Sequence, residues 1–108
     1  MNELIENTLA PLGLTVNYLE REDKIFPQVV YYFKEYSNAC GDNKVETDKY
    51  DIYFNLYIKK NISSTIKNIK KALGDNKFIK IVVNPPEKFK GLDYYQVTMN
   101  YKKIMISE

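Results

Sequence analysis

The ten residues 50–59, with the sequence YDIYFNLYIK, constrain the fold of this chain more than any other stretch. Large apolar side chains occupy every second position, at Tyr50, Ile52, Phe54, Leu56 and Ile58. A two-residue period places such a set on one face of a β-strand. The β-branched and aromatic residues also suit a half-buried, pleated surface. We therefore expect a strand in the middle of a sheet, with one face in the core and an alternate face that is polar but carries Tyr53 and Tyr57.

Six further segments have the pattern of a helix or a strand. Apolar residues recur at spacings of three and four in residues 3–11 and 63–73, which predicts two amphipathic helices. The β-rich segments predict strands at 14–18, 28–36, 78–83 and 94–106. We expect the last two to form a hairpin with a long tip.

The element order α-β-β-β-α-β-β predicts an α+β fold, with an antiparallel sheet of about four to five strands and two helices packed on one face. The chain has 108 residues, enough for a core that needs no metal or disulfide. We expect residues 1–108 to form a single domain. Charged residues 20–24 and polar residues 37–44 are expected to be loops.

The composition argues against most catalytic and metal chemistry. The chain has no His and one Cys, Cys40, so the common metal-ligand sets and acyl-transfer triads cannot be built. Its four Gly are scattered and form no phosphate-binding loop. We expect a protein that is not an enzyme, with no catalytic residue, no cofactor and no bound metal. No apolar stretch approaches the length of a transmembrane helix, so no membrane partner is expected.

Charge is distributed unevenly along the sequence. Residues 1–54 contain five basic and ten acidic residues, whereas residues 55–108 contain eleven basic and four acidic residues. A fold that interleaves the two halves would cancel this difference. A fold that keeps them apart would have one acidic and one basic side, suited to head-to-tail association between copies.

The pattern of elements resembles that of small phage tail-terminator or tail-completion proteins. The resemblance is carried by the strand start FPQVVY (26–31), the alternating strand YDIYFNLY (50–57), the amphipathic helix at 63–73 and the closing strand YYQVTMNY (94–101). It spans nearly the whole chain.

This resemblance implies a non-enzymatic structural component of a phage or phage-like particle, assembled in the bacterial cytoplasm. Subunits of that family form a ring, usually of six, through heterologous head-to-tail contacts. The ring ends or joins the tail tube at its head-proximal end. The implied partners are further copies of the chain, the tail-tube protein and the head-proximal connector, with nucleic acid near only because it passes through the tail lumen.

Tyrosine and lysine side chains are the candidates for contacts with a neighbouring subunit or partner. The chain has ten Tyr, whose rings suit surfaces where one end stays wet. The candidate interface residues are Tyr53, Tyr57, Lys67, Lys70, Lys71, Lys88 and Lys90.

The alternative hypothesis is a small nucleic-acid-binding module that uses Lys and Tyr on a sheet surface. Residues 90–97 overlay loosely on the pattern of an RNA-binding strand, matching at Lys90, Gly91 and the central aromatic residue. Asp93 would place a negative charge where phosphates approach, so we interpret the match as chance.

Overall fold

A computed structural model describes residues 1–38 and 46–107, so Cys40 and most of the predicted loop 37–44 lie outside the described residues. The helices are α1 (Asn2–Leu9), a short 3-10 turn η1 (Ala10–Leu12) and α2 (Ile62–Asp75). The strands are β1 (Thr15–Tyr18), β2 (Gln28–Asn38), β3 (Glu46–Ile58), β4 (Ile79–Val83) and β5 (Tyr95–Ser107).

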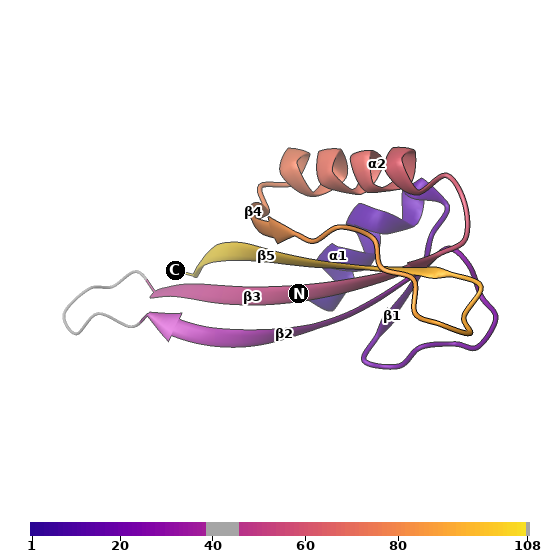
Figure 1. The fold of residues 1–108 in the computed structure, drawn as a ribbon. Coiled ribbons are helices and arrows are strands. Elements are labelled where there is room, and N and C mark those ends of the chain that lie inside the picture. The colour runs from indigo at the N-terminus through magenta and orange to yellow at the C-terminus, as the bar shows by residue number, and fades with distance from the viewer. Residues whose placement is uncertain (39–45, 108) are drawn as a thin grey trace.

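The strands form one sheet in the order β1-β2-β3-β5-β4, so the alternating segment is its central strand, as predicted. Both helices lie over the same face of this sheet (Figure 1). The α+β class, the order of elements and the β4–β5 hairpin are therefore confirmed.

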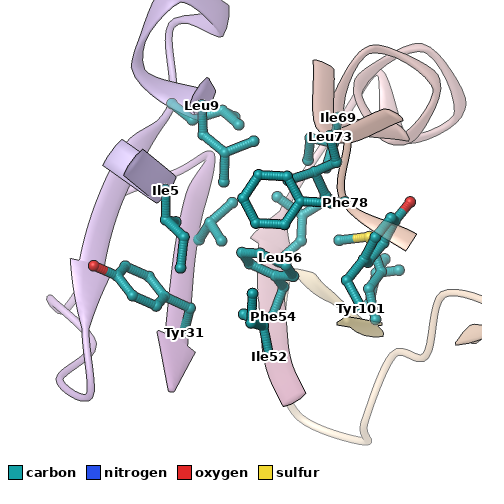
Figure 2. Packing of buried hydrophobic residues seen from close by; sticks show 14 of the residues in the cluster. Ile5, Leu9, Tyr31, Ile52, Phe54, Leu56, Ile69, Leu73, Phe78 and Tyr101 are labelled. Carbon is teal, nitrogen blue, oxygen red and sulfur yellow. The ribbon is translucent and has the colours of Figure 1, made fainter. Parts of the chain in front are cut away.

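The core lies between this sheet face and the two helices. Ile52, Phe54, Leu56 and Ile58 of β3 are all buried, because the two-residue period directs them to the same face. Ile5 and Leu9 of α1 cover the β2 side, while Ile69 and Leu73 of α2 cover the β5 side (Figure 2). The ring of Phe54 lies between those of Tyr31 and Tyr101, with centroids 6.3 and 6.0 Å away.

The sheet differs from the prediction in one pairing, because β1 runs parallel to β2. Thr15 pairs with Gln28 and Tyr18 with Tyr31, so residues 19–27 must carry the chain back to the start of β1. Side-chain periodicity is the same for parallel and antiparallel strands, so the sequence pattern did not indicate the direction.

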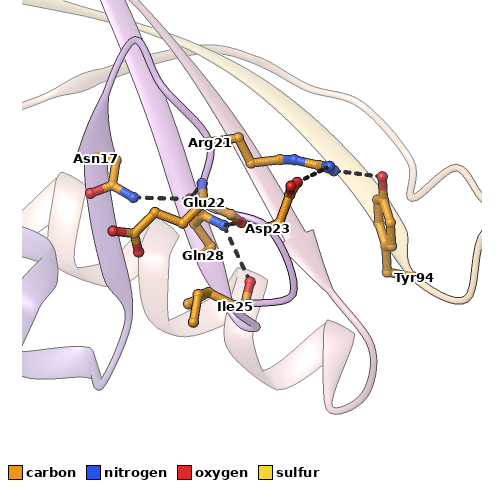
Figure 3. A network of polar contacts seen from close by, with 7 residues as sticks. All are labelled: Asn17, Arg21, Glu22, Asp23, Ile25, Gln28 and Tyr94. Atoms are coloured by element: carbon orange, nitrogen blue, oxygen red, sulfur yellow. Dashed lines mark hydrogen bonds and ion pairs between the residues drawn. The ribbon is translucent and has the colours of Figure 1, made fainter.

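The buried side chain of Gln28 holds this returning segment in place. Its Oε1 accepts hydrogen bonds from the backbone N–H of Glu22 at 2.7 Å and from Nδ2 of Asn17 at 2.9 Å (Figure 3). Its Nε2 donates to the carbonyls of Glu22 at 2.8 Å and Ile25 at 3.2 Å. A short parallel connection is thus stabilised by one amide whose donors and acceptor are all used.

The first helix ends earlier than predicted. The α-helix stops at Leu9, and residues 10–12 continue as a 3-10 turn that contains Pro11. Gly13 follows with φ of 77°, a left-handed conformation that glycine adopts without steric cost.

The three long strands give the molecule an elongated shape, with a longest dimension of 55 Å. Strands β2, β3 and β5 stay paired well beyond the helices and form an arm (Figure 1). On its two sides, β3 stays paired as far as Thr47 opposite Asn38 of β2 and Glu46 opposite Ser107 of β5. Beyond the helices, both faces of the arm lack a covering layer among the described residues.

Replacing Tyr31 by Phe is expected to maintain or raise stability at neutral pH, by up to about 1 kcal/mol, because an unpaired buried hydroxyl is removed. The Tyr31 hydroxyl is buried and has no hydrogen-bond partner among the described residues. Burial raises its pKa to about 12, above the ordinary value of about 10.

The fold therefore favours the neutral phenol. The free energy of unfolding therefore does not change with the ionisation of Tyr31 below pH 10, and it falls as the pH rises from 10 toward 12, because the unfolded state ionises first. Urea unfolding at pH 7 and at pH 11 would show a smaller alkaline loss for Tyr31→Phe than for the wild type. The exposed Tyr36 gives the neutral-pH control Tyr36→Phe, and a clear loss of stability in Tyr31→Phe alone would contradict the prediction.

Candidate interaction surfaces

The sheet face opposite the helices is the first candidate surface, because no helix covers it in the described chain. Tyr32 and Tyr53 stack on each other there, with centroids 4.9 Å apart and planes 16° from parallel. Beside them lies a shallow groove of about 260 Å³, bordered mainly by amide, hydroxyl and apolar side chains from β3, β4 and β5: Asn55, Val82, Thr98, Asn100 and, just past β4, Asn84. The groove presents neutral hydrogen-bonding groups and is not a site of concentrated charge.

Arg21 organises a second surface at the end of the sheet where β2 begins. Its guanidinium lies over the rings of Tyr57 and Tyr94, 5.1 and 5.4 Å from their centroids. It also donates a 2.6 Å hydrogen bond to the Tyr94 hydroxyl and forms a 3.3 Å ion pair with Asp23 (Figure 3). The hydrogen bond to Tyr94 is the main reason that the pKa of Arg21 is raised, so its charge is fixed.

A hollow of about 370 Å³ adjoins this cluster and is lined by Arg21, Asp23, Lys24, Phe26, Lys59, Asp93 and Tyr94. Lys59 forms a 3.2 Å ion pair with Asp93 and lies 4.8 Å from the centroid of the Phe26 ring. The hydrogen bond from Lys59 lowers the pKa of Asp93. Arg21 and Lys59 are each paired with a nearby acid, and Lys24 is a third basic residue in the lining. The hydrogen bond from Arg21 to Tyr94 joins the β1–β2 loop to the β4–β5 loop.

No local pattern in the sequence predicts this cluster, although one residue stands out. Arg21 is the one arginine in a chain with fifteen lysines. Its planar guanidinium stacks on aromatic rings and forms directed hydrogen bonds in ways that lysine does not.

The structure separates the predicted interface residues into three groups. Tyr53 and Tyr57 lie on the uncovered sheet face, where Tyr57 is already in contact with Arg21 and Tyr94. Lys67, Lys70 and Lys71 lie on the exposed side of α2, and Lys71 forms a 3.6 Å ion pair with Asp75. Lys88 and Lys90 belong to the loop between β4 and β5, with Lys88 lying 5.7 Å from the centroid of the Tyr95 ring. No single patch joins these residues, and their role at an interface stays a prediction.

The two charged halves of the sequence do not fully interleave in the fold. The helix α1 packs against β1, and α2 packs against β4 at the opposite edge of the sheet. Residues 1–18, which form α1 and β1, contain two acidic residues and no basic residue. Residues 60–83, which form α2 and β4, contain six basic residues and one acidic residue. The molecule therefore has an acidic edge and a basic edge.

The described residues offer no cluster of three or more His, Cys, Asp or Glu side chains that could hold a metal ion. Neither helix is long and apolar enough to cross a membrane in this part of the chain.

Comparison with known proteins gives a likeness in fold. No protein-family model matches the chain, and no curated protein matches it in sequence. The fold is similar to that of a chain in a solved structure described as the virion of a native gene transfer agent (GTA) particle. The TM-score is 0.50 at 10% sequence identity, and the match covers 93% of this chain and 84% of that chain. At this identity the likeness concerns the fold alone.

Proposed function

We propose that this chain is a structural subunit of a phage-like particle that assembles into a ring, with six copies as in the family it resembles, and ends or joins the tail tube at its head-proximal end. The observation that carries the proposal is the fold likeness across nearly the whole chain to a component of a gene transfer agent virion. The resemblance of the sequence to tail-terminator proteins points in the same direction.

The charge distribution gives this proposal independent physical support. A ring needs heterologous contacts, in which one surface of a subunit meets a different surface of the next. An acidic edge with α1 and β1, and a basic edge with α2 and β4, supply two unlike and complementary surfaces. The tail-tube protein and the head-proximal connector are the proposed partners of the assembled ring.

The nucleic-acid alternative receives less support from the geometry. The lysines of α2 lie on the opposite side of the sheet from Tyr53 and Tyr57, so these candidate residues would not act together on one strand of nucleic acid. Tyr53 already stacks on Tyr32, and Tyr57 already contacts Arg21.

Light scattering of the purified chain, alone and mixed with a phage tail-tube protein from the same genome, tests the proposal. For a chain of 12.7 kDa, a hexameric ring has a mass of roughly 76 kDa. We expect this species to appear on concentration or on addition of tube protein. A chain that stays monomeric and never binds the tube would contradict the proposal, and salt-sensitive binding to single-stranded DNA or RNA would favour the alternative.

A further inference from the structure

The two outer strands of the sheet are unusual in how much apolar surface they expose. In β4, Ile79, Ile81 and Val82 are 48%, 51% and 42% exposed, and Lys80 is the one charged residue of the strand. At the other end of the sheet, Tyr18 of β1 and the adjacent Leu19 are 40% and 61% exposed. Edge strands of soluble proteins are usually short, charged, bulged or covered, because their unpaired backbone groups readily pair with another strand. Strand β4 has one such irregularity, between Lys80 and Val82, yet its apolar side chains stay exposed.

Backbone hydrogen bonds identify which groups these edges offer. Thr15 and Leu19 donate their N–H groups to carbonyls on the β2 side, at 3.3 and 3.0 Å, so alternation directs the N–H groups of Val16 and Tyr18 away from β2. The backbone N–H of Asn84 donates to the carbonyl of Thr98 in β5 at 2.9 Å. The backbone N–H and C=O groups of even-numbered β5 residues therefore point toward β4. Lys80 pairs with the odd-numbered Tyr101, and its N–H group therefore points outward.

The strand directions fix how a second copy would fit. Strand β1 is parallel to β2, and each of the next three pairings, β2–β3, β3–β5 and β5–β4, is antiparallel. Hence β1 and β4 run in opposite directions. A neighbour in the same orientation, with its helices on the same face, presents its β1 antiparallel to β4. The strands have four and five residues, so they match in length.

Charge selects this pairing over a symmetric one. Two β4 edges would bring together two basic surfaces, and two β1 edges would bring together two acidic ones. The pairing of β4 with β1 brings opposite charges together instead.

We infer that the β4 edge of one subunit pairs with the β1 edge of the next, extending the sheet from subunit to subunit around a ring. This inference rests on the proposed ring and names the surfaces that close it. The backbone groups of the two edges supply hydrogen bonds, and the exposed Ile81 and Leu19 supply apolar area that becomes buried. The occupant of each edge is a second copy of this chain.

Two proline variants test the inference, because each blocks one edge. Lys80→Pro and Tyr18→Pro each remove an outward N–H group and spare the hydrogen bonds to the adjacent strand. Each variant alone is expected to be monomeric where the wild type assembles. A one-to-one mixture is expected to form a heterodimer of roughly 25 kDa and nothing larger. The intact β1 edge of Lys80→Pro can pair with the intact β4 edge of Tyr18→Pro, and the other two edges are blocked. Its affinity should fall at least about fivefold between 0.05 and 0.5 M salt.

Circular dichroism checks that the variants are folded. If either proline variant unfolds, Ile81→Asp and Leu19→Asp replace the pair, because these exposed positions tolerate a charge in the monomer but not in a desolvated interface.

The outcomes separate the inference from the proposed function. Rings that persist in both edge variants would overturn the edge pairing and leave the ring itself standing. Self-association of Tyr18→Pro or of Lys80→Pro alone would indicate a symmetric edge contact and would also overturn it. A wild-type chain that stays monomeric at millimolar concentration, with and without tube protein, would overturn both.

Discussion

Phe54→Ala is expected to lower the free energy of unfolding by about 3–5 kcal/mol, the largest effect of any single substitution considered for this chain. Phe54 is 1% exposed and lies at the centre of the core, between Tyr31 and Tyr101. Truncation removes buried apolar area and leaves a cavity between strands that hydrogen bonds hold in register. Total stabilities of small proteins are about 5–15 kcal/mol, so the loss would be a large fraction of the total.

Urea unfolding followed by circular dichroism measures this effect, and the adjacent residue supplies the control. Tyr53 is on the same strand but faces the uncovered side, where it stacks on Tyr32. Tyr53→Ala is expected to cost less than half as much, since an aromatic pair contributes about 0.5–1.5 kcal/mol beyond its area. Equal losses for the two variants would mean that the uncovered face is as well packed as the core.

Gln28→Leu is expected to lower the free energy of unfolding by about 2–4 kcal/mol, although leucine has a similar size. The substitution removes all four hydrogen bonds of the Gln28 amide and leaves the N–H and carbonyl of Glu22 and the carbonyl of Ile25 without their partner. These hydrogen bonds are partly buried, and backbone groups that lose such a partner cost more than the hydrogen bonds contributed. The parallel return from β1 to β2 should loosen before the rest of the sheet.

Hydrogen exchange distinguishes this local effect from general instability. In Gln28→Leu, the Glu22 amide should exchange faster than in the wild type while amides of β3 and β5 keep their protection. The matched control is Gln96→Leu, because Gln96 is partly buried and its side chain makes a single 3.5 Å hydrogen bond to Asn55. Similar losses in both variants would argue against a special role for Gln28.

The proposed ring also depends on features that these stability experiments do not change. The acidic and basic edges are formed mainly by exposed side chains, and the strands that carry them are at opposite ends of the sheet. Core variants therefore test the fold, whereas edge variants test assembly. Keeping these sets apart lets a loss of assembly be assigned to the interface.

Some features of the candidate surfaces followed from the sequence and others did not. The uneven charge of the two halves was visible, but only the positions of α1 and α2 at opposite edges made it a difference between two sides. The lysines of α2 and the tyrosines of β3 are all candidate interface residues, and only the fold shows that they lie on opposite sides of the sheet. The Arg21 cluster joins residues from three distant segments, and local patterns cannot report such contacts.

The sequence by itself determined the local structure of this protein. Alternation in residues 50–59 set the buried face of β3, and the three- and four-residue spacings set the apolar faces of α1 and α2, because side-chain periodicity is a local property of backbone geometry. The tertiary structure alone decided the parallel direction of β1, the burial of Gln28 and the exposure of β4. These features depend on which strands become neighbours in the sheet. Strand pairing joins residues that are distant in the chain, so it cannot be read from the local periodicity of the sequence.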